Sequence, residues 1–148
     1  IPADRLAVIT ADEFATLMNL PRGPVGTKLA ALYAQSLREL GAFVRDGHGG
    51  RYLGVVEQAG GSAARLVESL SALPSFNDVF DYKGTRVPLL KRAQITAADL
   101  HLAFGKRGRT LFADIYQLTM FPDNAVAHVL HEDGILVYDA ALEAKVAA

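Results

Sequence analysis

Apolar residues recur at helical spacing through most of the chain, and they predict a series of helices. The clearest helix runs from about residue 27 to residue 44, where six side chains fall on one face: Leu29, Leu32, Tyr33, Leu37, Leu40 and Val44. A second helix is predicted over residues 89–104, with Pro88 in the first position that suits proline. This segment is apolar on most sides, which is typical of a central helix.

Capping signals place the shorter helices. Thr10 is followed three residues later by Glu13, the spacing of a capping box, so a helix is predicted to begin there. Ser62 precedes another helical pattern and is a favourable N-cap residue. Asp123 and Asp139 each precede a short helical pattern near the end of the chain, and both are expected to cap it.

Strand signals are few. Residues 80–87 have apolar positions on both sides of a Lys-Gly turn, which predicts a small hairpin. Residues 52–56 fit either a short strand or a buried helical turn, and the pattern alone does not separate the two. The chain of 148 residues is therefore predicted to be mainly α, a compact helical domain over residues 1–148 with at most a short hairpin.

Composition narrows the classes of function. The formal net charge is −1, so the chain lacks the overall basic field of a nucleic-acid-binding domain. The absence of cysteine excludes disulfides and thiolate metal sites, and it fits a reducing compartment. No apolar run approaches the ~20 residues of a membrane helix. We expect a cytoplasmic monomer with no nucleic-acid partner and no membrane contact.

Two other features carry weaker signals. His128 and His131 are three residues apart, whereas the two-histidine zinc helix uses a spacing of four and a third ligand elsewhere. We therefore expect no metal and no other cofactor. The basic loop at residues 106–109 fits either a phosphate contact or, more commonly, a solvated surface loop.

Asp123 and Lys91 are the residues best suited to carry chemistry. Asp123 lies between the apolar segment 118–122 and a helix start, where a cap is the commoner role. The same setting holds a carboxylate ionised, so that it can act as a base toward water or stabilise a developing cation. Lys91 lies in a predicted first helical turn, where a cation opposes the helix dipole. Such a lysine is either a solvated cation or has an anionic partner, and the candidate partners are Asp123, Asp114 or a ligand phosphate.

Three stretches read together resemble one family. They are Pro74–Asp78, then Lys91–Ile95 with Ala98-Asp99, and then Leu118–Asn124 with His128–Leu130 and Asp133–Tyr138. In this combination they are similar to the queuosine salvage proteins, the queuosine 5′-phosphate N-glycosylase/hydrolase family. The resemblance is firm over residues 76–142 and weaker, but collinear, over residues 9–75.

The resemblance implies an all-helical fold related to DNA glycosylases. It also implies an N-ribosyl hydrolase that releases the base queuine from queuosine 5′-monophosphate, a small-molecule nucleotide, in the salvage of queuine for tRNA modification. Carried over position by position, the catalytic residues are Asp123 and Lys91. Contacts to the substrate are expected from Arg92, Gln94, Asp78, Phe121, Asn124 and His128.

The chain also departs from the family pattern. Pro122 replaces a small residue, and Ala127 stands where a proline is usual. Family members are longer, so residues 1–148 are expected to be a piece of a longer queuosine-salvage-type protein. The alternative to an active hydrolase is accordingly a catalytically incomplete fragment or a ligand-binding helical module of the same family.

Overall fold

The computed structural model describes residues 1–104 and 107–147, and these residues are mainly helical with one short hairpin. The mainly α prediction is therefore confirmed. In chain order the elements are α1 (Ala3–Leu6), α2 (Ala11–Leu17), α3 (Pro24–His48), α4 (Tyr52–Ala59), α5 (Ala63–Leu70), the 3₁₀ turn η1 (Pro74–Phe76), β1 (Val79–Tyr82), β2 (Thr85–Pro88), α6 (Lys91–Ala103), the 3₁₀ turns η2 (Gly108–Thr110) and η3 (Ile115–Gln117), α7 (Asn124–Glu132) and α8 (Ala140–Val146).

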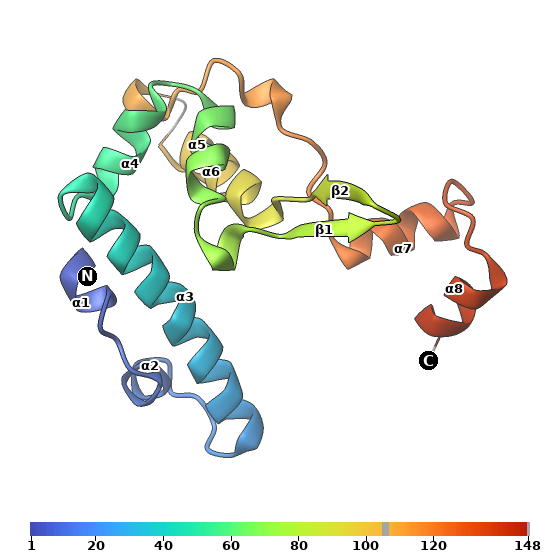
Figure 1. The fold of residues 1–148 in the computed structure, drawn as a ribbon, viewed down its shortest axis with the longest axis horizontal. Helices are drawn as coiled ribbons and strands as arrows, with labels where there is room; N and C mark the ends of the chain where they lie inside the picture. Colours follow the sequence, from blue (N-terminus) through green and yellow to red (C-terminus); the bar gives the residue numbers. More distant parts are fainter. Residues whose placement is uncertain (105–106, 148) are drawn as a thin grey trace.

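The elements follow an open arc (Figure 1). The long helix α3 forms one side of the arc, and α1 and α2 pack along it. Helices α4, α5 and α6 form the middle, and the hairpin leads toward α7 and α8 at the other end. Within the described ranges, none of the helices is long and apolar enough to cross a membrane.

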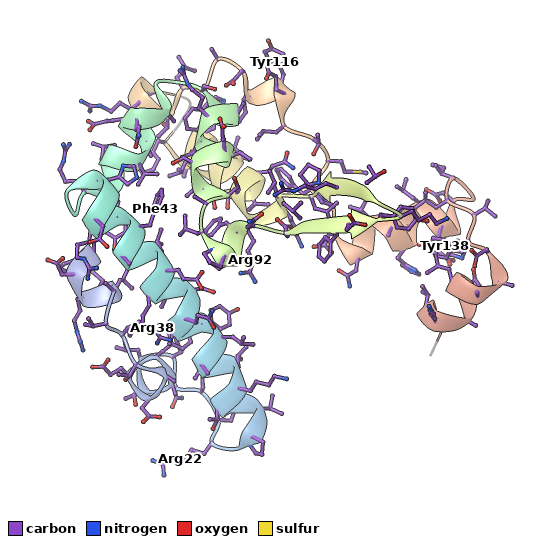
Figure 2. The ribbon with its side chains drawn as sticks, viewed as in Figure 1. Arg22, Arg38, Phe43, Arg92, Tyr116 and Tyr138 are labelled. Atoms are coloured by element: carbon purple, nitrogen blue, oxygen red, sulfur yellow. The ribbon has the colours of Figure 1, made fainter. Side chains whose placement is uncertain are left out.

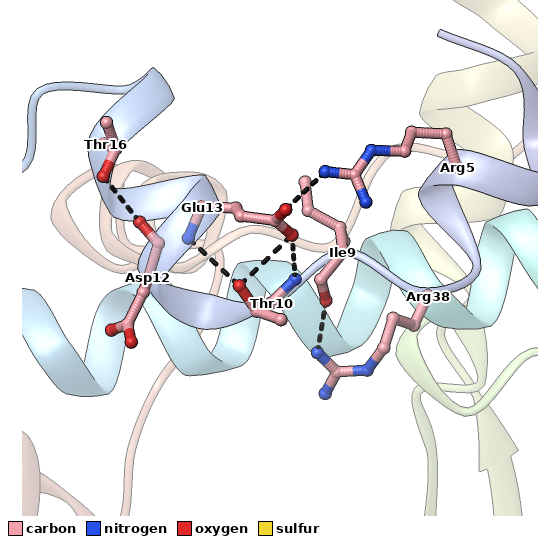
Figure 3. A network of polar contacts seen from close by, with 7 residues as sticks. All are labelled: Arg5, Ile9, Thr10, Asp12, Glu13, Thr16 and Arg38. Carbon is pink, nitrogen blue, oxygen red and sulfur yellow. Dashed lines mark hydrogen bonds and ion pairs between the residues drawn. The ribbon is translucent and has the colours of Figure 1, made fainter.

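The start of α2 is fixed by the capping box that its sequence predicts (Figure 3). Thr10 Oγ1 accepts from the Glu13 N–H at 3.2 Å, and a Glu13 carboxylate oxygen accepts from the Thr10 N–H at 2.9 Å. Glu13 also pairs with Arg5 of α1, and Arg38 of α3 donates to the Ile9 carbonyl oxygen at 2.8 Å. These contacts join the three N-terminal helices by polar groups at their edges.

Helix α3 is longer than the segment 27–44 that the apolar pattern predicts. It begins at Pro24, because proline has a suitable φ and needs no intrahelical donor in the first turn. It continues to His48 and ends where Gly49 adopts the left-handed conformation, with φ of 60°. The added residues are 24–26, which include proline and glycine, and 45–48, which are polar apart from Gly47, so an apolar pattern does not include them.

The ambiguous segment 52–56 is helical and belongs to α4. Val55, Val56 and Ala59 of this helix are buried, at a spacing that suits a helical face. The helix ends at Gly60, which has a φ of 56° and therefore stops the helix as a left-handed cap. A helical turn was thus the correct one of the two alternatives.

The hydrophobic core lies where α3, α4, α5 and α6 meet. Its buried members are Ala3, Val44, Val55, Val56, Ala59, Ala63, Leu66, Val67, Leu70, Leu73, Ala93, Ala97 and Phe112. Helix α6 contributes one face to this core through Ala93 and Ala97, while Phe104, just after its end, is 60% exposed. Helix α6 is therefore central, as predicted, but it is not buried on most sides.

The hairpin forms as predicted for residues 80–87. Lys83 and Gly84 at its turn both have positive φ, 52° and 79°, which suits the twist of a two-residue hairpin loop. The register pairs Val79 with Pro88, so Pro88 is the last residue of β2. The prediction that Pro88 opens the next helix is wrong, because this residue belongs to the ladder.

Candidate active site

The first turn of α6 is built by residues from outside the helix. Leu90 adopts the left-handed conformation, with φ of 49° and ψ of 35°, so the helix begins at Lys91 and not at the predicted residue 89. The Asp78 carbonyl oxygen accepts from the Leu89 N–H at 3.0 Å, and the Asp78 carboxylate accepts from the Lys91 N–H at 3.0 Å. Asp78 therefore supplies the cap that Leu90 cannot provide.

Asp123 caps α7 and also binds Lys91. One carboxylate oxygen of Asp123 accepts from the Ala125 N–H at 3.0 Å, and the other pairs with the Lys91 ammonium. The two paired side chains are 32% and 33% exposed, so solvent and ligands can reach both. Of the candidate partners, Asp123 is the one that Lys91 contacts in the structure, and the capping role and the ion pair coexist in one carboxylate.

The electrostatics of the pair keep Asp123 ionised. The hydrogen bond from the Lys91 ammonium is the largest cause that lowers the pKa of the Asp123 carboxyl, and the Ala125 amide lowers this pKa further. An ionised carboxylate with one face toward solvent can stabilise a developing positive charge or orient a water molecule.

Asp114, the other candidate partner of Lys91, serves a different helix. It accepts from the Ser62 hydroxyl at 2.7 Å and from the Ala63 N–H at 2.6 Å, at the start of α5. These hydrogen bonds, led by the one from Ser62, lower the pKa of Asp114. Pairing of Asp114 with Lys91 is thus ruled out, because its oxygens are occupied at α5.

Gln94 lies one turn after Lys91 on α6 and is buried, with 7% of its surface exposed. Its side-chain oxygen accepts from the Thr119 N–H at 2.8 Å, and its side-chain nitrogen donates to the Leu89 carbonyl oxygen at 3.0 Å. Gln94 therefore lies close to the pair, and its amide is engaged by the protein itself.

The other predicted substrate contacts differ in exposure and in their partners. Arg92 is exposed and donates to the Ser75 carbonyl oxygen at 2.9 Å, on the inner side of the arc (Figure 2). Phe121 is half-buried just before Asp123, whereas Asn124 and His128 are exposed on α7. The structure thus brings Lys91, Asp123, Asp78 and Gln94 together. Substrate binding by the six predicted contacts stays a prediction.

An apolar hollow of about 500 Å³ lies elsewhere, among α3, α4, α5 and α6. Its lining includes Leu40, Val44, Tyr52, Leu66, Leu100 and Phe104, with Arg107 and Arg109 at one side. Neither Lys91 nor Asp123 lines this hollow. Residue 106 of the basic loop at residues 106–109 lies outside the described residues, and Arg109 pairs with Glu57 at 2.9 Å.

Sequence reasoning missed two residues of this site. Leu90 was placed inside a helix, because nothing in its type signals a left-handed backbone. Thr119 stands inside the motif at residues 118–124, yet it was given no role. Gln94 and Thr119 are 25 residues apart in the sequence, so their contact is seen only once α6 and residues 118–123 lie side by side in the fold.

Comparison with known proteins places the chain in a family. A family model described as queuosine salvage protein matches residues 3–148. The chain belongs to this family. A relative from Sphaerobacter thermophilus, named queuosine 5′-phosphate N-glycosylase/hydrolase, is 40% identical over 146 residues, which cover 98% of this chain and 44% of the relative.

Two further relatives of the queuosine salvage family carry the same name. One from Schizosaccharomyces pombe is 36% identical over 105 residues, which cover 70% of this chain and 30% of the relative. One from Nematostella vectensis is 31% identical over 140 residues, which cover 93% of this chain and 40% of the relative. The chain thus spans less than half the length of these curated relatives.

Proposed function

We propose that this chain carries the site of an N-ribosyl hydrolase that releases queuine from queuosine 5′-monophosphate. The observation that supports this most is the pairing of Lys91 with Asp123, which lie 32 residues apart in the sequence. The names of the relatives supply the substrate class, a small nucleotide. The role is then queuine salvage for tRNA modification, performed by a cytoplasmic enzyme on a nucleotide and not on nucleic acid.

The proposed reaction breaks the bond between the sugar and the base. Positive charge develops on the sugar ring as this bond lengthens, and the Asp123 carboxylate stabilises that charge. A water molecule, oriented by Asp123, then forms the new bond to the anomeric carbon and gives up a proton, so that one water is divided between the sugar and the base. The bonding electrons leave with the base, which takes up a proton.

Lys91 has two roles open to it in this scheme. Its ammonium can donate a hydrogen bond to the departing 7-deazaguanine base, or it can bind the 5′-phosphate. The half-buried Phe121 and the exposed Asn124 flank Asp123 along the chain, where they can contact the nucleotide. Asp78, Arg92 and His128 are proposed to complete these contacts.

The test is release of queuine from queuosine 5′-phosphate by the wild-type chain and by Asp123→Asn. We expect the substitution to lower the rate about 10²–10⁴-fold, because asparagine lacks the charge that the sugar cation needs. Folding should survive, since asparagine caps a helix as well as aspartate does.

Asp139→Asn is a matched control for this experiment. Asp139 caps α8 through the Leu142 N–H at 2.8 Å, just as Asp123 caps α7 through Ala125. The control should therefore keep the wild-type rate. If Asp123→Asn also keeps the wild-type rate, Asp123 is a cap only and the proposed mechanism fails.

A second candidate function is a ligand-binding module without turnover. The observation that favours it is the length of the relatives, because this chain spans 44% of the Sphaerobacter protein. Titration calorimetry with queuosine 5′-phosphate separates the two functions. Binding without release of queuine supports the module, and release of queuine supports the hydrolase. We also propose that residues 1–148 form one monomeric folding unit, which sedimentation measurements can test.

A further inference from the structure

The side-chain amide of Gln94 joins α6 to the segment that leads to Asp123. The Thr119 N–H donates to Gln94 Oε1 at 2.8 Å, and Gln94 Nε2 donates to the Leu89 carbonyl oxygen at 3.0 Å and to Thr119 Oγ1 at 3.0 Å. The orientation of the amide is fixed by chemistry, because a backbone N–H only donates and a carbonyl oxygen only accepts. We call this set of contacts the Gln94 clamp.

The position of Asp123 depends on the Gln94 clamp, because few buried apolar side chains hold this part of the chain in place. Residues 118–123 have no regular secondary structure. Leu118 still packs against the core, but α7, which Asp123 caps, contains no buried residue. Thr119 is thus attached to α6 between the last core contact and the carboxylate. An attachment four residues from Asp123 limits where that carboxylate can lie.

Gln94 is also poorly suited to bind a substrate directly. It is 7% exposed, and its oxygen and nitrogen both have partners within the protein. A ligand would have to displace the Thr119 N–H or the Leu89 carbonyl oxygen to reach it. Lys91 lies on the same face of α6 one turn earlier, so the clamp and the pair share one rigid element.

We propose that Gln94 is a positioning residue, which holds residues 118–123 against α6 so that Asp123 meets Lys91. Its effect on the rate rests on the proposed hydrolase function, whereas its effect on the geometry does not. This assignment replaces the substrate contact expected for Gln94 from the family resemblance.

The test compares Gln94→Leu with Gln117→Leu, the same change at an exposed residue of η3. The Ala125 amide, which donates to the Asp123 carboxylate, reports the ionisation of Asp123 in a pH titration by NMR. Without the clamp, the Lys91 contact weakens, so the titration midpoint should rise toward the ordinary aspartate value. Gln117→Leu should leave the midpoint unchanged.

The kinetic measurement separates positioning from substrate binding. Displacement of a catalytic group by about 1 Å can cost ~10²-fold in rate. We therefore expect Gln94→Leu to lower kcat about 10²-fold, with KM close to that of the wild type. An increase in KM with unchanged kcat would instead make Gln94 a substrate contact and overturn the proposal.

Variants of Thr119 keep the proposal testable if Gln94→Leu fails to fold. Thr119→Ser retains both groups that contact Gln94, so its titration midpoint should match the wild type. Thr119→Val loses the hydroxyl but keeps the N–H, so a smaller rise of the midpoint is expected. An unchanged midpoint in both Gln94→Leu and Thr119→Val, or in Thr119→Val alone if the former does not fold, overturns the proposal.

If the wild-type chain releases no queuine, the proposed function fails while the titration still decides the role of Gln94.

Discussion

The residues before and after position 118 differ in what stabilises them: apolar burial before it, and local and polar contacts after it. Among the described residues, every buried one lies at or before residue 112. We call residues 1–118 the packed part and residues 119–147 the C-terminal arm. The chain exposes 10,085 Å² of surface, above the roughly 7,400 Å² typical of a folded monomer of its mass. This is expected when a packed part carries an extended arm (Figure 1).

The arm is held together by local contacts. His131 stacks on Tyr138 with a ring-centroid distance of 4.3 Å, and Asp139 caps α8 through the Leu142 N–H at 2.8 Å. Polar contacts attach the arm to the packed part: the Lys91–Asp123 pair and the Gln94 clamp. The candidate catalytic pair takes one residue from each part, so its geometry rests on hydrogen bonds at the junction more than on apolar packing.

Truncation of a core side chain should give the largest contrast between the two parts. Leu66 of α5 is 1% exposed, so Leu66→Ala should lower the free energy of unfolding by about 2–5 kcal/mol. Val129 of α7 is 54% exposed, so Val129→Ala should change this free energy by no more than about 0.5 kcal/mol. Denaturant unfolding of both variants measures the difference. Equal losses would show that the arm packs as tightly as the core.

Two glycines in α3 allow a test of how closely α1 packs against this helix. A Cβ added at Gly41 would lie 2.3 Å from the Ala7 backbone nitrogen, so α1 would have to move. Gly41→Ala should therefore lower the free energy of unfolding by about 1–3 kcal/mol. A Cβ at Gly47 meets no atom within 4 Å, so Gly47→Ala should raise that free energy by about 0.4–1 kcal/mol.

These two substitutions make the same chemical change in the same helix. The difference between their effects on thermal unfolding therefore measures the contribution of the contact between α1 and α3. If Gly41→Ala is as stable as Gly47→Ala, α1 is not held against α3 in solution. The packed part would then begin at α3, and α1 would resemble the arm.

Sequence patterns predicted helix and hairpin boundaries well where the capping or turn residues lie next to the element in the sequence. The capping box at Thr10, the caps at Ser62, Asp123 and Asp139, and the hairpin turn at Lys83 were all readable, because each uses residues within a few positions. The start of α6 was misplaced because its cap comes from Asp78, thirteen positions earlier. A cap supplied across such a distance leaves no local pattern.

Burial in the core also depends on contacts between residues that are distant in the sequence. Phe112 is 1% exposed and ranks among the largest fully buried side chains, yet it lies in a segment without periodic apolar pattern. It is buried because Ala113 and Asp114 attach this segment to Gly61 and to the start of α5. Such tertiary contacts cannot be deduced from spacing.

The sequence predicted contact between two side chains of the candidate site, but it did not predict which residues hold them in place. Asp123 and Lys91 followed from helix-start positions and from the family resemblance, and their contact is confirmed. The choice between Asp123 and Asp114 as partner of Lys91 stayed open in the sequence. It is settled by the relative placement of α5, α6 and α7, which involves several loops at once.

The Lys91–Asp123 pair, which attaches the arm to the packed part, should be broken in acid and intact at neutral pH. Hydrogen bonds from the Lys91 ammonium and then from the Ala125 amide hold the pKa of the Asp123 carboxyl below its ordinary value. A carboxyl with a lowered pKa contributes its contact fully above the ordinary value, about 3.9, and loses it as the pH falls through the lowered value. The attachment of the arm at this point should therefore be complete at pH 7 and weaken only in strong acid.

The Ala125 amide resonance measures this effect, because its N–H donates to the Asp123 carboxylate at 3.0 Å. Its titration midpoint in the wild type should lie below the ordinary aspartate value. Lys91→Gln removes the ammonium and should raise the midpoint toward that value, while Asp123→Asn should abolish the titration. A wild-type midpoint at or above the ordinary value would mean that the Lys91–Asp123 pair is open in solution. Of the two polar contacts described between the packed part and the arm, only the Gln94 clamp would then remain, and Asp123 would keep its capping role.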